Sequence, residues 1–213
     1  MKIKRIDCRD RYGEFVNGTE SEWIRQATNG NDTAFCYLVE AYQKPVFNLC
    51  YRLLGNTHDA EDAAQESFFR AYRNLKKYDP QRSFTNWLLS IASHYCIDCM
   101  RKKHAVTIST EELPETFQHD SNAPEPEKVM SKQENELRIQ SLVNKLSPKD
   151  KAIIVLKYWY EFSTSDISDA LSLTESSVKS RLFRARKELA GKLIDQSKKA
   201  SRIKRQFNET QTI

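Results

Sequence analysis

Residues 165–189, SDISDALSLTESSVKSRLFRARKEL, decide the architecture of this chain of 213 residues. Apolar residues recur here at every third or fourth position, which predicts two helices, Ser165–Leu171 and Glu175–Leu193. Only residues 172–174 separate the two helices, and Thr174 is placed to cap the second one. Two helices joined by such a short turn are typical of a helix-turn-helix, whose second helix enters the major groove of DNA.

Start and stop signals surround this motif. The run Ser147-Pro148-Lys149-Asp150 combines a serine cap, a proline in the first turn and an acid three residues after the cap, and it predicts a helix from Pro148 to Tyr160. Before it, residues 105–130 contain three prolines and several acids but little apolar pattern, which predicts a flexible linker. We therefore expect a second helical domain at residues 131–194 and a basic, flexible tail at residues 195–213.

The N-terminal half predicts a separate helical bundle. Helices are expected at about residues 32–54, 57–75 and 84–103. Pro45 lies inside the first of these, where we expect a kink or a break, and Ser83 is placed to cap the third. With only five glycines and six prolines in the chain, the sequence predicts an all-α fold of two small domains. The first domain is expected at residues 26–104, after a flexible lead-in at residues 1–25.

The charge distribution suggests a polyanionic partner. The net charge is +3 over residues 1–103, −4 over residues 104–146 and +6 over residues 147–213. Two basic blocks separated by an acidic stretch are consistent with two surfaces that bind nucleic acid, although solvated helices alone would also explain the charges. Because no apolar run approaches the length of a bilayer span and no signal-peptide core follows Met1, we expect a cytoplasmic protein without membrane insertion.

Two segments of the chain resemble the extracytoplasmic-function (ECF) group of sigma-70 family factors. Residues 59–72, DAEDAAQESFFRAY, followed by residues 84–92, FTNWLLSIA, and residues 98–102, DCMRK, resemble sigma region 2. Residues 146–189, with VKSRL and RAR in the last predicted helix, resemble sigma region 4. Three positions depart from the family pattern: Asp166-Ile167-Ser168 stands where Glu-Ile-Ala is common, Ser172 where a turn glycine is common, and His94 where a basic or amide residue is common. Ser172 would be mildly strained if its position requires a positive φ.

The resemblance implies a sigma factor that binds core RNA polymerase at its clamp, directs promoter recognition and DNA melting, and is held inactive by an anti-sigma factor. The core-binding set that it implies is Asp59, Asp62, Gln65, Glu66, Phe69 and Arg70. The set implied for the minus-ten element is Lys76, Lys77, Arg82, Ser83, Phe84, His94, Asp98, Arg101, Lys102 and Lys103. The set implied for the minus-thirty-five element is Thr174, Glu175, Ser176, Ser177, Lys179, Ser180, Arg181 and Arg184.

The chemistry of these residues allows functional and structural interpretations. The acids of the first set can pair with arginines of a partner helix, or they can cap the helix dipole and stay solvated. In the second set, cations suit phosphates and aromatic rings suit an unstacked base, whereas Phe84 and Trp87 also fit core positions. In the third set, residues near the helix start are expected to reach base edges, while Arg181 and Arg184 are expected to meet phosphates.

Two other classes of function compete with this interpretation. A stand-alone helix-turn-helix regulator, with a sensor or dimerisation domain before it, would bind duplex DNA without polymerase. An enzyme is not expected, because the sequence has no glycine-rich phosphate loop and no pairing of a nucleophile with a base. Cys96 and Cys99 lie three residues apart on a predicted helix and could suggest a metal, but buried thiols are the preferred interpretation, and we expect no cofactor.

Overall fold

The computed structural model describes residues 19–109 and 138–210, and side chains for residues 19–103 and 138–194. Every regular element within these ranges is a helix, so the predicted all-α class is confirmed. The chain divides into two compact units, residues 1–96 and 97–213. The predicted lead-in before residue 19 and most of the predicted linker lie outside the described residues.

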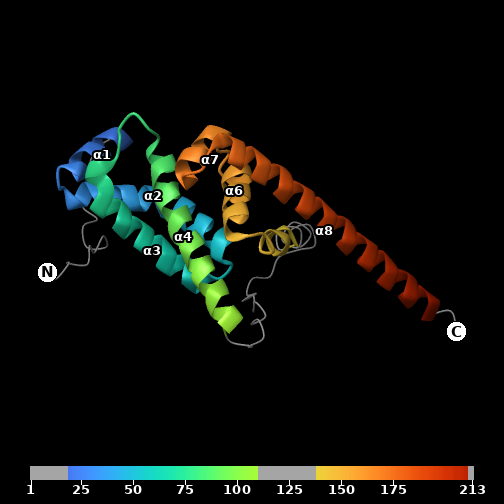
Figure 1. Cartoon of the computed structure of the whole chain (residues 1–213). Coiled ribbons are helices and arrows are strands. Elements are labelled where there is room, and N and C mark those ends of the chain that lie inside the picture. The colour runs from blue at the N-terminus through green and yellow to red at the C-terminus, as the bar shows by residue number, and fades with distance from the viewer. Residues whose placement is uncertain (1–18, 110–137, 211–213) are drawn as a thin grey trace. The chain divides into compact units, whose positions relative to one another are not determined.

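The N-terminal unit is a helical bundle. It contains α1 (Glu20–Thr28), α2 (Asp32–Leu54), α3 (Thr57–Asn74), the short 3-10 helix η1 (Leu75–Lys77) and the first part of α4 (Phe84–Ser109). Helix α2 packs against both α1 and α3, as Figure 1 shows. Leu49 and Leu53 of α2 and Leu89 of α4 are fully buried, and Ala60 and Ala71 are small residues of α3 that allow a close helix–helix approach.

Two features of this unit differ from the sequence-based expectation. Helix α1 begins at Glu20, within the predicted flexible lead-in, because Ile24 and Ala27 are buried and Trp23 packs on Tyr37 with ring centroids 5.6 Å apart. Helix α2 also continues through Pro45, so the break that we expected there as one of two outcomes is absent. An interior proline costs a helix about 3 kcal/mol, and burial of the apolar residues that follow it in α2 offsets this cost.

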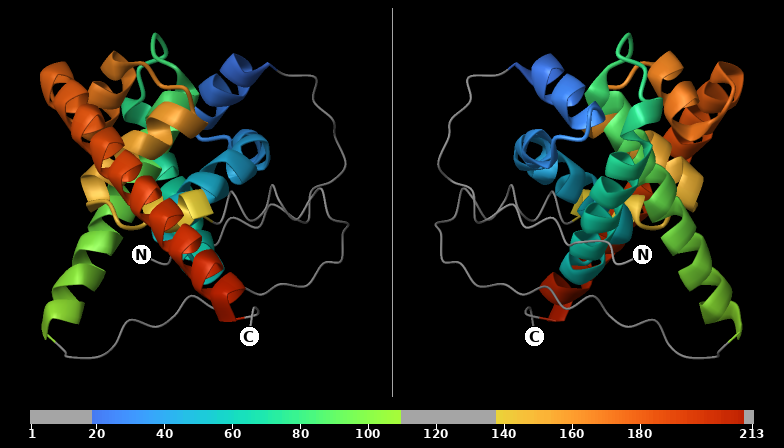
Figure 2. Two further views of the ribbon diagram at one scale, coloured as in Figure 1. Left: turned by 90° about the vertical axis from the view of Figure 1, so that its right-hand side faces the viewer. Right: turned by 90° about the vertical axis from the view of Figure 1, so that its left-hand side faces the viewer.

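The C-terminal unit contains a helix-turn-helix. Residues 138–143 are helical, and α6 (Pro148–Trp159), α7 (Thr164–Leu171) and α8 (Glu175–Thr210) follow. Helices α6 and α7 pack against the first part of α8, whereas the rest of α8 extends beyond them (Figure 2). Their shared core contains large apolar side chains that are fully buried: Ile153, Val155, Leu156, Ile167 and Val178.

The helix ends follow the signals in the sequence. Ser147 accepts a hydrogen bond from the backbone of Asp150 at 3.3 Å, and Thr174 accepts one from Ser177 at 3.2 Å, so both predicted caps are present. Ser172 ends α7 in the left-handed conformation with φ of 52°, which is the conformation that makes a glycine common in this turn. The helix-turn-helix therefore forms here at the expense of a mildly strained serine.

Helix α8 is longer than the pattern predicts, since it continues to Thr210 rather than ending near residue 193. Residues 195–210 contain no glycine or proline and are rich in lysine, arginine and glutamine, which favour helix. In the described ranges, no helix combines the length and apolar character of a membrane-spanning segment.

Candidate nucleic-acid and partner interfaces

The outer face of α3 carries the predicted core-binding residues. Asp59, Asp62, Glu66 and Arg70 are three or four positions apart, so they share one face of the helix. Glu66 and Arg70 are paired to each other at 2.7 Å, and Arg70 also lies over the ring of Tyr95 at 4.6 Å. The face therefore has an acidic N-terminal part and a neutralised C-terminal part.

Within the acidic part, the carboxylates have different environments. The carboxylate of Asp59 accepts a hydrogen bond from the side-chain amide of Asn56, and Asn56 Oδ1 caps α3 by accepting one from the backbone N–H of Asp59 at 2.7 Å. Asp62 is exposed and lies 3.4 Å from the exposed His58, and Gln65 is also exposed. Phe69 is half-buried beneath Arg73, whose guanidinium lies 5.6 Å from the ring centroid. Asp62 and Gln65 are thus the members of this set most accessible to a partner.

A cluster of four aromatic rings lies at the base of the loop formed by residues 78–83. Phe84 is in contact with Tyr42 and Tyr78, each with ring centroids 5.4 Å away, and with Trp87 at 5.5 Å. Tyr78 also contacts Trp87 at 5.1 Å. Phe84 is only 3% exposed, so it supports the loop and does not itself present a surface to DNA. We refer to Tyr42, Tyr78, Phe84 and Trp87 as the aromatic cluster.

Hydrogen bonds brace the loop above this cluster. The hydroxyl of Tyr78 donates to the backbone carbonyl of Arg82, and the carboxylate of Asp79 accepts from the backbone of Gln81 at 3.0 Å. Burial raises the pKa of Tyr78, with the carboxylates of Glu20 and Asp79 adding to the shift. The tyrosine hydroxyl therefore remains protonated and able to donate at neutral pH.

Helix α1 is tied to the same region by a hydrogen-bond chain that sequence reasoning missed. Thr85 donates to the hydroxyl of Tyr42 at 3.1 Å, and that hydroxyl donates to Glu20 at 2.8 Å. Burial raises the pKa of Tyr42, the bond from Thr85 opposes this shift, and Glu20 adds to it. The apolar spacing of Trp23, Ile24 and Ala27 was the available signal, but it covers only one turn.

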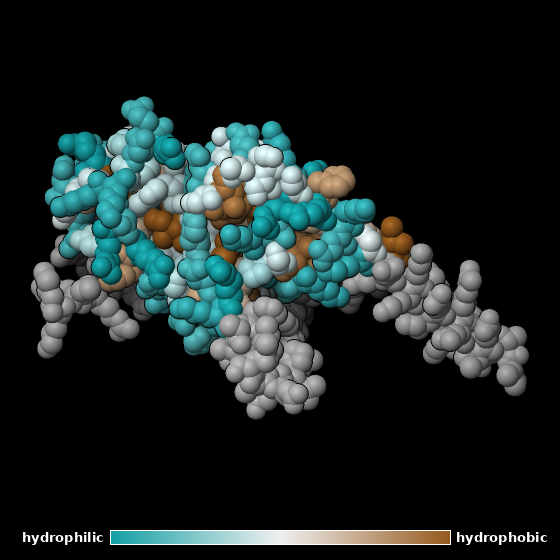
Figure 3. All heavy atoms as spheres, in the orientation of Figure 1, coloured by the Kyte–Doolittle hydropathy of each residue, from teal (hydrophilic) through white to brown (hydrophobic). Residues whose placement is uncertain are grey.

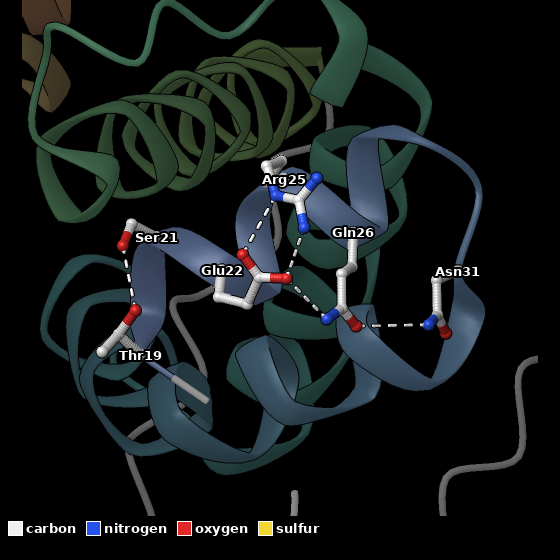
Figure 4. A network of polar contacts seen from close by, with 6 residues as sticks. All are labelled: Thr19, Ser21, Glu22, Arg25, Gln26 and Asn31. Atoms are coloured by element: carbon white, nitrogen blue, oxygen red, sulfur yellow. Dashed lines mark hydrogen bonds and ion pairs between the residues drawn. The ribbon is translucent and has the colours of Figure 1, made fainter. Parts of the chain in front are cut away.

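Polar contacts along α1 stabilise its exposed face (Figure 4). Glu22 accepts from Arg25 at 2.6 Å and 3.0 Å and from Gln26 at 2.8 Å. The hydrogen bonds from Arg25, which have the larger influence, and the one from Gln26 lower the pKa of Glu22 to about 2. The network reaches the start of α2, where Asn31 caps the helix and donates to Gln26 at 3.4 Å.

The remaining predicted minus-ten residues have exposed side chains, most of them cationic, on η1, on the loop and on α4. The exposed side chains are Lys76, Lys77, Arg82, Ser83, His94, Asp98, Arg101, Lys102 and Lys103. On α4, His94, Asp98 and Arg101 are spaced by four and three positions and so share one face. The His94 ring lies 3.0 Å from the backbone carbonyl of Ser90.

Helix α8 turns a regular stripe of side chains to solvent. Ser176, Ser180, Phe183 and Lys187 are exposed and recur at intervals of four and three, whereas Val178 and other apolar residues on the opposite face are buried. Thr174, Glu175, Lys179 and Arg184, from the predicted set, are also exposed, and Ser177 is half-buried. Lys179 is paired with Glu175 at 3.6 Å. We call Ser176, Ser180, Phe183 and Lys187 the α8 stripe.

Phe183 was missed by sequence reasoning, although its side chain is 65% exposed in the middle of the α8 stripe. An aromatic side chain at helical spacing usually indicates a core position, which is why the pattern did not single it out. Its exposure could have been anticipated from its place three residues after Ser180 and one before Arg184. In Figure 3, apolar residues interrupt an otherwise hydrophilic surface in only a few places.

Arg181 is partly buried, as Ser177 is, and it differs from the other predicted minus-thirty-five residues because it is paired with a residue of another helix. Its Nη1 lies 2.9 Å from Oδ1 of Asp150 at the start of α6. Cys96 is buried and Cys99 half-buried, and the described residues contain no group of three side chains suited to hold a metal ion.

Known proteins match both units. Residues 38–106 match the family model of Sigma-70 region 2, and residues 136–189 match that of Sigma-70 region 4. The chain is 38% identical over 178 residues to the ECF RNA polymerase sigma factor SigW of Bacillus subtilis, covering 81% of this chain and 95% of that protein. It is 29% identical over 193 residues to the ECF RNA polymerase sigma factor SigE of Mycolicibacterium smegmatis, covering 84% of this chain and 74% of that one.

Solved structures show the same fold. CnrH in complex with the cytosolic domain of CnrY matches with a TM-score of 0.61 and 23% identity, over 83% of this chain and 97% of that one. The sigma factor RpoE from Bartonella quintana, in complex with the anti-sigma factor NepR, matches with a TM-score of 0.59 and 19% identity, over 75% of this chain and 96% of that one.

Proposed function

This chain belongs to the ECF group of RNA polymerase sigma factors, and we propose that α3 binds core polymerase while the loop with α4 and the start of α8 bind promoter DNA. A sigma factor gives core polymerase promoter recognition and starts DNA melting. The stand-alone regulator is not favoured, because the match spans both regions and not the helix-turn-helix alone.

We propose that residues 20–104 form the module for core polymerase and the minus-ten element, which starts at α1 and not at the expected residue 26. Residues 131–194 are then the module for the minus-thirty-five element and residues 105–130 the linker, and the family matches to residues 38–106 and 136–189 support this division. Two modest contacts joined by a linker act together, because binding of the first raises the effective concentration of the second.

The acidic part of the α3 face suits an arginine-bearing helix of the polymerase clamp. Asp62 and Gln65 are exposed and one turn apart, and Glu66 can exchange its intramolecular arginine for one on a partner. Because this exchange exposes Arg70 to solvent, it gains less binding free energy than a new ion pair would.

The loop of residues 78–83 suits capture of a base taken out of the duplex. Melting requires an unstacked base to be held, which otherwise costs a few kcal/mol. The aromatic cluster fixes the base of the loop, and the exposed cations Lys76, Lys77 and Arg82 surround it, so a non-template strand can be held through its phosphates while one base enters the loop.

The α8 stripe is the observation that most directly supports promoter recognition. Helix-turn-helix proteins place the start of the second helix against base edges, and here that part carries exposed hydroxyl, cationic and aromatic side chains on one face. Hydroxyl groups hydrogen-bond base edges, and a phenyl ring packs on the methyl group of thymine. We therefore add Phe183 to the proposed minus-thirty-five residues.

We further infer that an anti-sigma factor binds this chain in the cytoplasm. The support is the structure of the similar sigma factor RpoE with the anti-sigma factor NepR. Exposed large apolar side chains of the described C-terminal unit, which a bound protein would cover, add to it: Ile139, Tyr158, Phe183, Leu193 and Ile194.

Reconstituted transcription tests the proposed function. The purified chain is mixed with bacterial core RNA polymerase and a library of promoter fragments, and run-off transcripts are sequenced. Promoter-specific transcripts that require the chain are expected, and their start sites identify both elements. Failure to bind core polymerase, together with a shift of duplex DNA by the chain alone, would instead support the stand-alone regulator.

A further inference from the structure

The ion pair between Asp150 and Arg181 joins the start of α6 to the DNA-facing part of α8. Arg181 Nη1 donates to Asp150 Oδ1 at 2.9 Å, across 31 positions of sequence. The two side chains are only 27% and 25% exposed. A charge-assisted hydrogen bond in such a setting holds its groups more firmly than a surface ion pair does.

Asp150 is itself fixed by the N-terminus of α6. Ser147 Oγ accepts from the backbone of Asp150 at 3.3 Å and donates to Asp150 Oδ2 at 2.6 Å. The carboxylate also lies in the first turn of α6, where the helix dipole favours a negative charge. Each carboxylate oxygen thus has its own donor, and the side chain cannot rotate without losing one of them.

The guanidinium of Arg181 is consequently held in one orientation. Its Nε is buried and, among the residues the structure describes, has no hydrogen-bond acceptor, while Nη1 donates to Asp150. The second N–H of Nη1 and both N–H groups of Nη2 are not used by Asp150, so three N–H groups remain for a ligand. Arg181 also lies four positions after Ser177 and three before Arg184, in a row beside the α8 stripe. A phosphate that follows this row can reach the outer edge of the guanidinium.

We propose that Asp150 is a positioning residue for promoter binding, which holds Arg181 so that its outer N–H groups bind a backbone phosphate of the minus-thirty-five element. The inference rests on the proposed function of α8. The negative charge of Asp150 is balanced by Arg181 and by the Ser147 hydroxyl, so the carboxylate orients the guanidinium without repelling the phosphate. Arg181 keeps enough donors to bind both groups, because a guanidinium has five N–H bonds.

The direction in which one substitution changes promoter affinity separates this role from simple electrostatics. Removing an acid near DNA should strengthen binding by long-range attraction. For Asp150→Asn we expect the opposite: polymerase holoenzyme reconstituted with the variant binds a promoter duplex about threefold to tenfold more weakly. The factor should be the same for the selected minus-thirty-five sequence and for mutated ones, because a phosphate contact carries no sequence information.

Changes at Arg181 complete the test. Arg181→Ala should weaken binding about tenfold and lower the slope of log affinity against log salt by about 1. Adding Asp150→Asn to Arg181→Ala should cause no further loss, because Asp150 acts through the arginine. Asp150→Glu, which keeps the charged acceptor, should recover most of the affinity.

Glu161→Gln is the matched control, since it also removes one negative charge from an exposed position of the same unit and should cause no loss. Affinities are measured at a temperature at which circular dichroism shows every variant to be folded. The proposal is overturned if Asp150→Asn binds as tightly as the wild type, or if it weakens the Arg181→Ala variant equally. Wild-type holoenzyme that fails to bind any promoter would instead contradict the proposed function.

Discussion

The two parts of this chain that we propose to bind DNA are built in different ways. The loop of residues 78–83 is held from below, by the aromatic cluster and by a hydrogen bond from Tyr78 to the carbonyl of Arg82. The α8 stripe is held by a regular helix, whose opposite face is buried against α6 and α7. A pocket for a single base needs an irregular backbone of defined shape, whereas duplex reading needs a straight row of side chains. Substitutions should therefore act on the two parts by different physical routes.

Phe84→Ala should have the largest effect, because it removes the ring shared by Tyr42, Tyr78 and Trp87. Loss of a buried phenylalanine costs about 3–5 kcal/mol of unfolding free energy. Thermal unfolding should show this destabilisation, and permanganate footprinting should show loss of promoter melting. Phe183→Ala, the same change on α8, should alter the unfolding free energy by less than about 0.5 kcal/mol. Equal destabilisation by both would contradict the contrast between the two parts.

Phe183→Ala should instead weaken minus-thirty-five binding by about 1 kcal/mol, the free energy of burying about one methyl group. The effect should depend on sequence. Each thymine of the element is replaced by uracil in turn, and the affinity of holoenzyme for the duplex is measured. At one position, wild type and variant should then bind with equal affinity. If no uracil substitution narrows the difference, Phe183 does not contact a thymine methyl.

Tyr78→Phe should affect only promoter melting, and the size of its effect should be comparable to or smaller than that of Phe183→Ala on minus-thirty-five binding. It removes the hydrogen bond to Arg82 but keeps the ring in the aromatic cluster, so a loss of about 0.5–1.5 kcal/mol is expected. The open-complex rate should fall on duplex promoters and recover on a template with a preformed bubble. A defect that persists on the preformed bubble would place Tyr78 in a step after melting.

The smallest effect is expected at the exposed network on α1. Arg25 and Gln26 lower the pKa of Glu22 from 4.5 to about 2, so the stabilisation from this network is fully present above pH 4.5 and is lost as the pH falls toward 2. NMR titration of the Glu22 carboxyl group should show this, and Arg25→Gln should return the pKa toward 4.5. Transcription at neutral pH should be unchanged by Arg25→Gln, because α1 is tied to the loop through Glu20 and not through Glu22.

Much of the fold was predictable because local signals and tertiary contacts agree. The caps at Ser147 and Thr174 and the short turn with Ser172 were visible in the sequence, and each is present in the structure. Helix α1 was not predicted, because its single apolar turn is stable only against α2. Tertiary burial also explains why α2 continues through Pro45, because it outweighs the tendency of proline to break a helix.

The candidate sites were less predictable than the fold. Their residues could be placed on faces from spacing, but exposure and pairing depend on contacts far apart in sequence. Phe183 is exposed although it is aromatic, and Phe84 is buried although it stands beside the loop. The partner of Arg181 lies 31 positions away, at a helix start that the sequence shows only as a cap.

Because α8 is continuous, a dye at its C-terminal end can be used to measure distances to promoter DNA by energy transfer. The 36 residues of α8 correspond to about 54 Å of helix, beginning at the end that we propose to read the promoter. A dye attached at position 210 would therefore report the direction of the recognition helix while standing clear of the bases. Energy transfer to a second dye on promoter DNA can then follow the seating of this helix during initiation, without a probe in the groove.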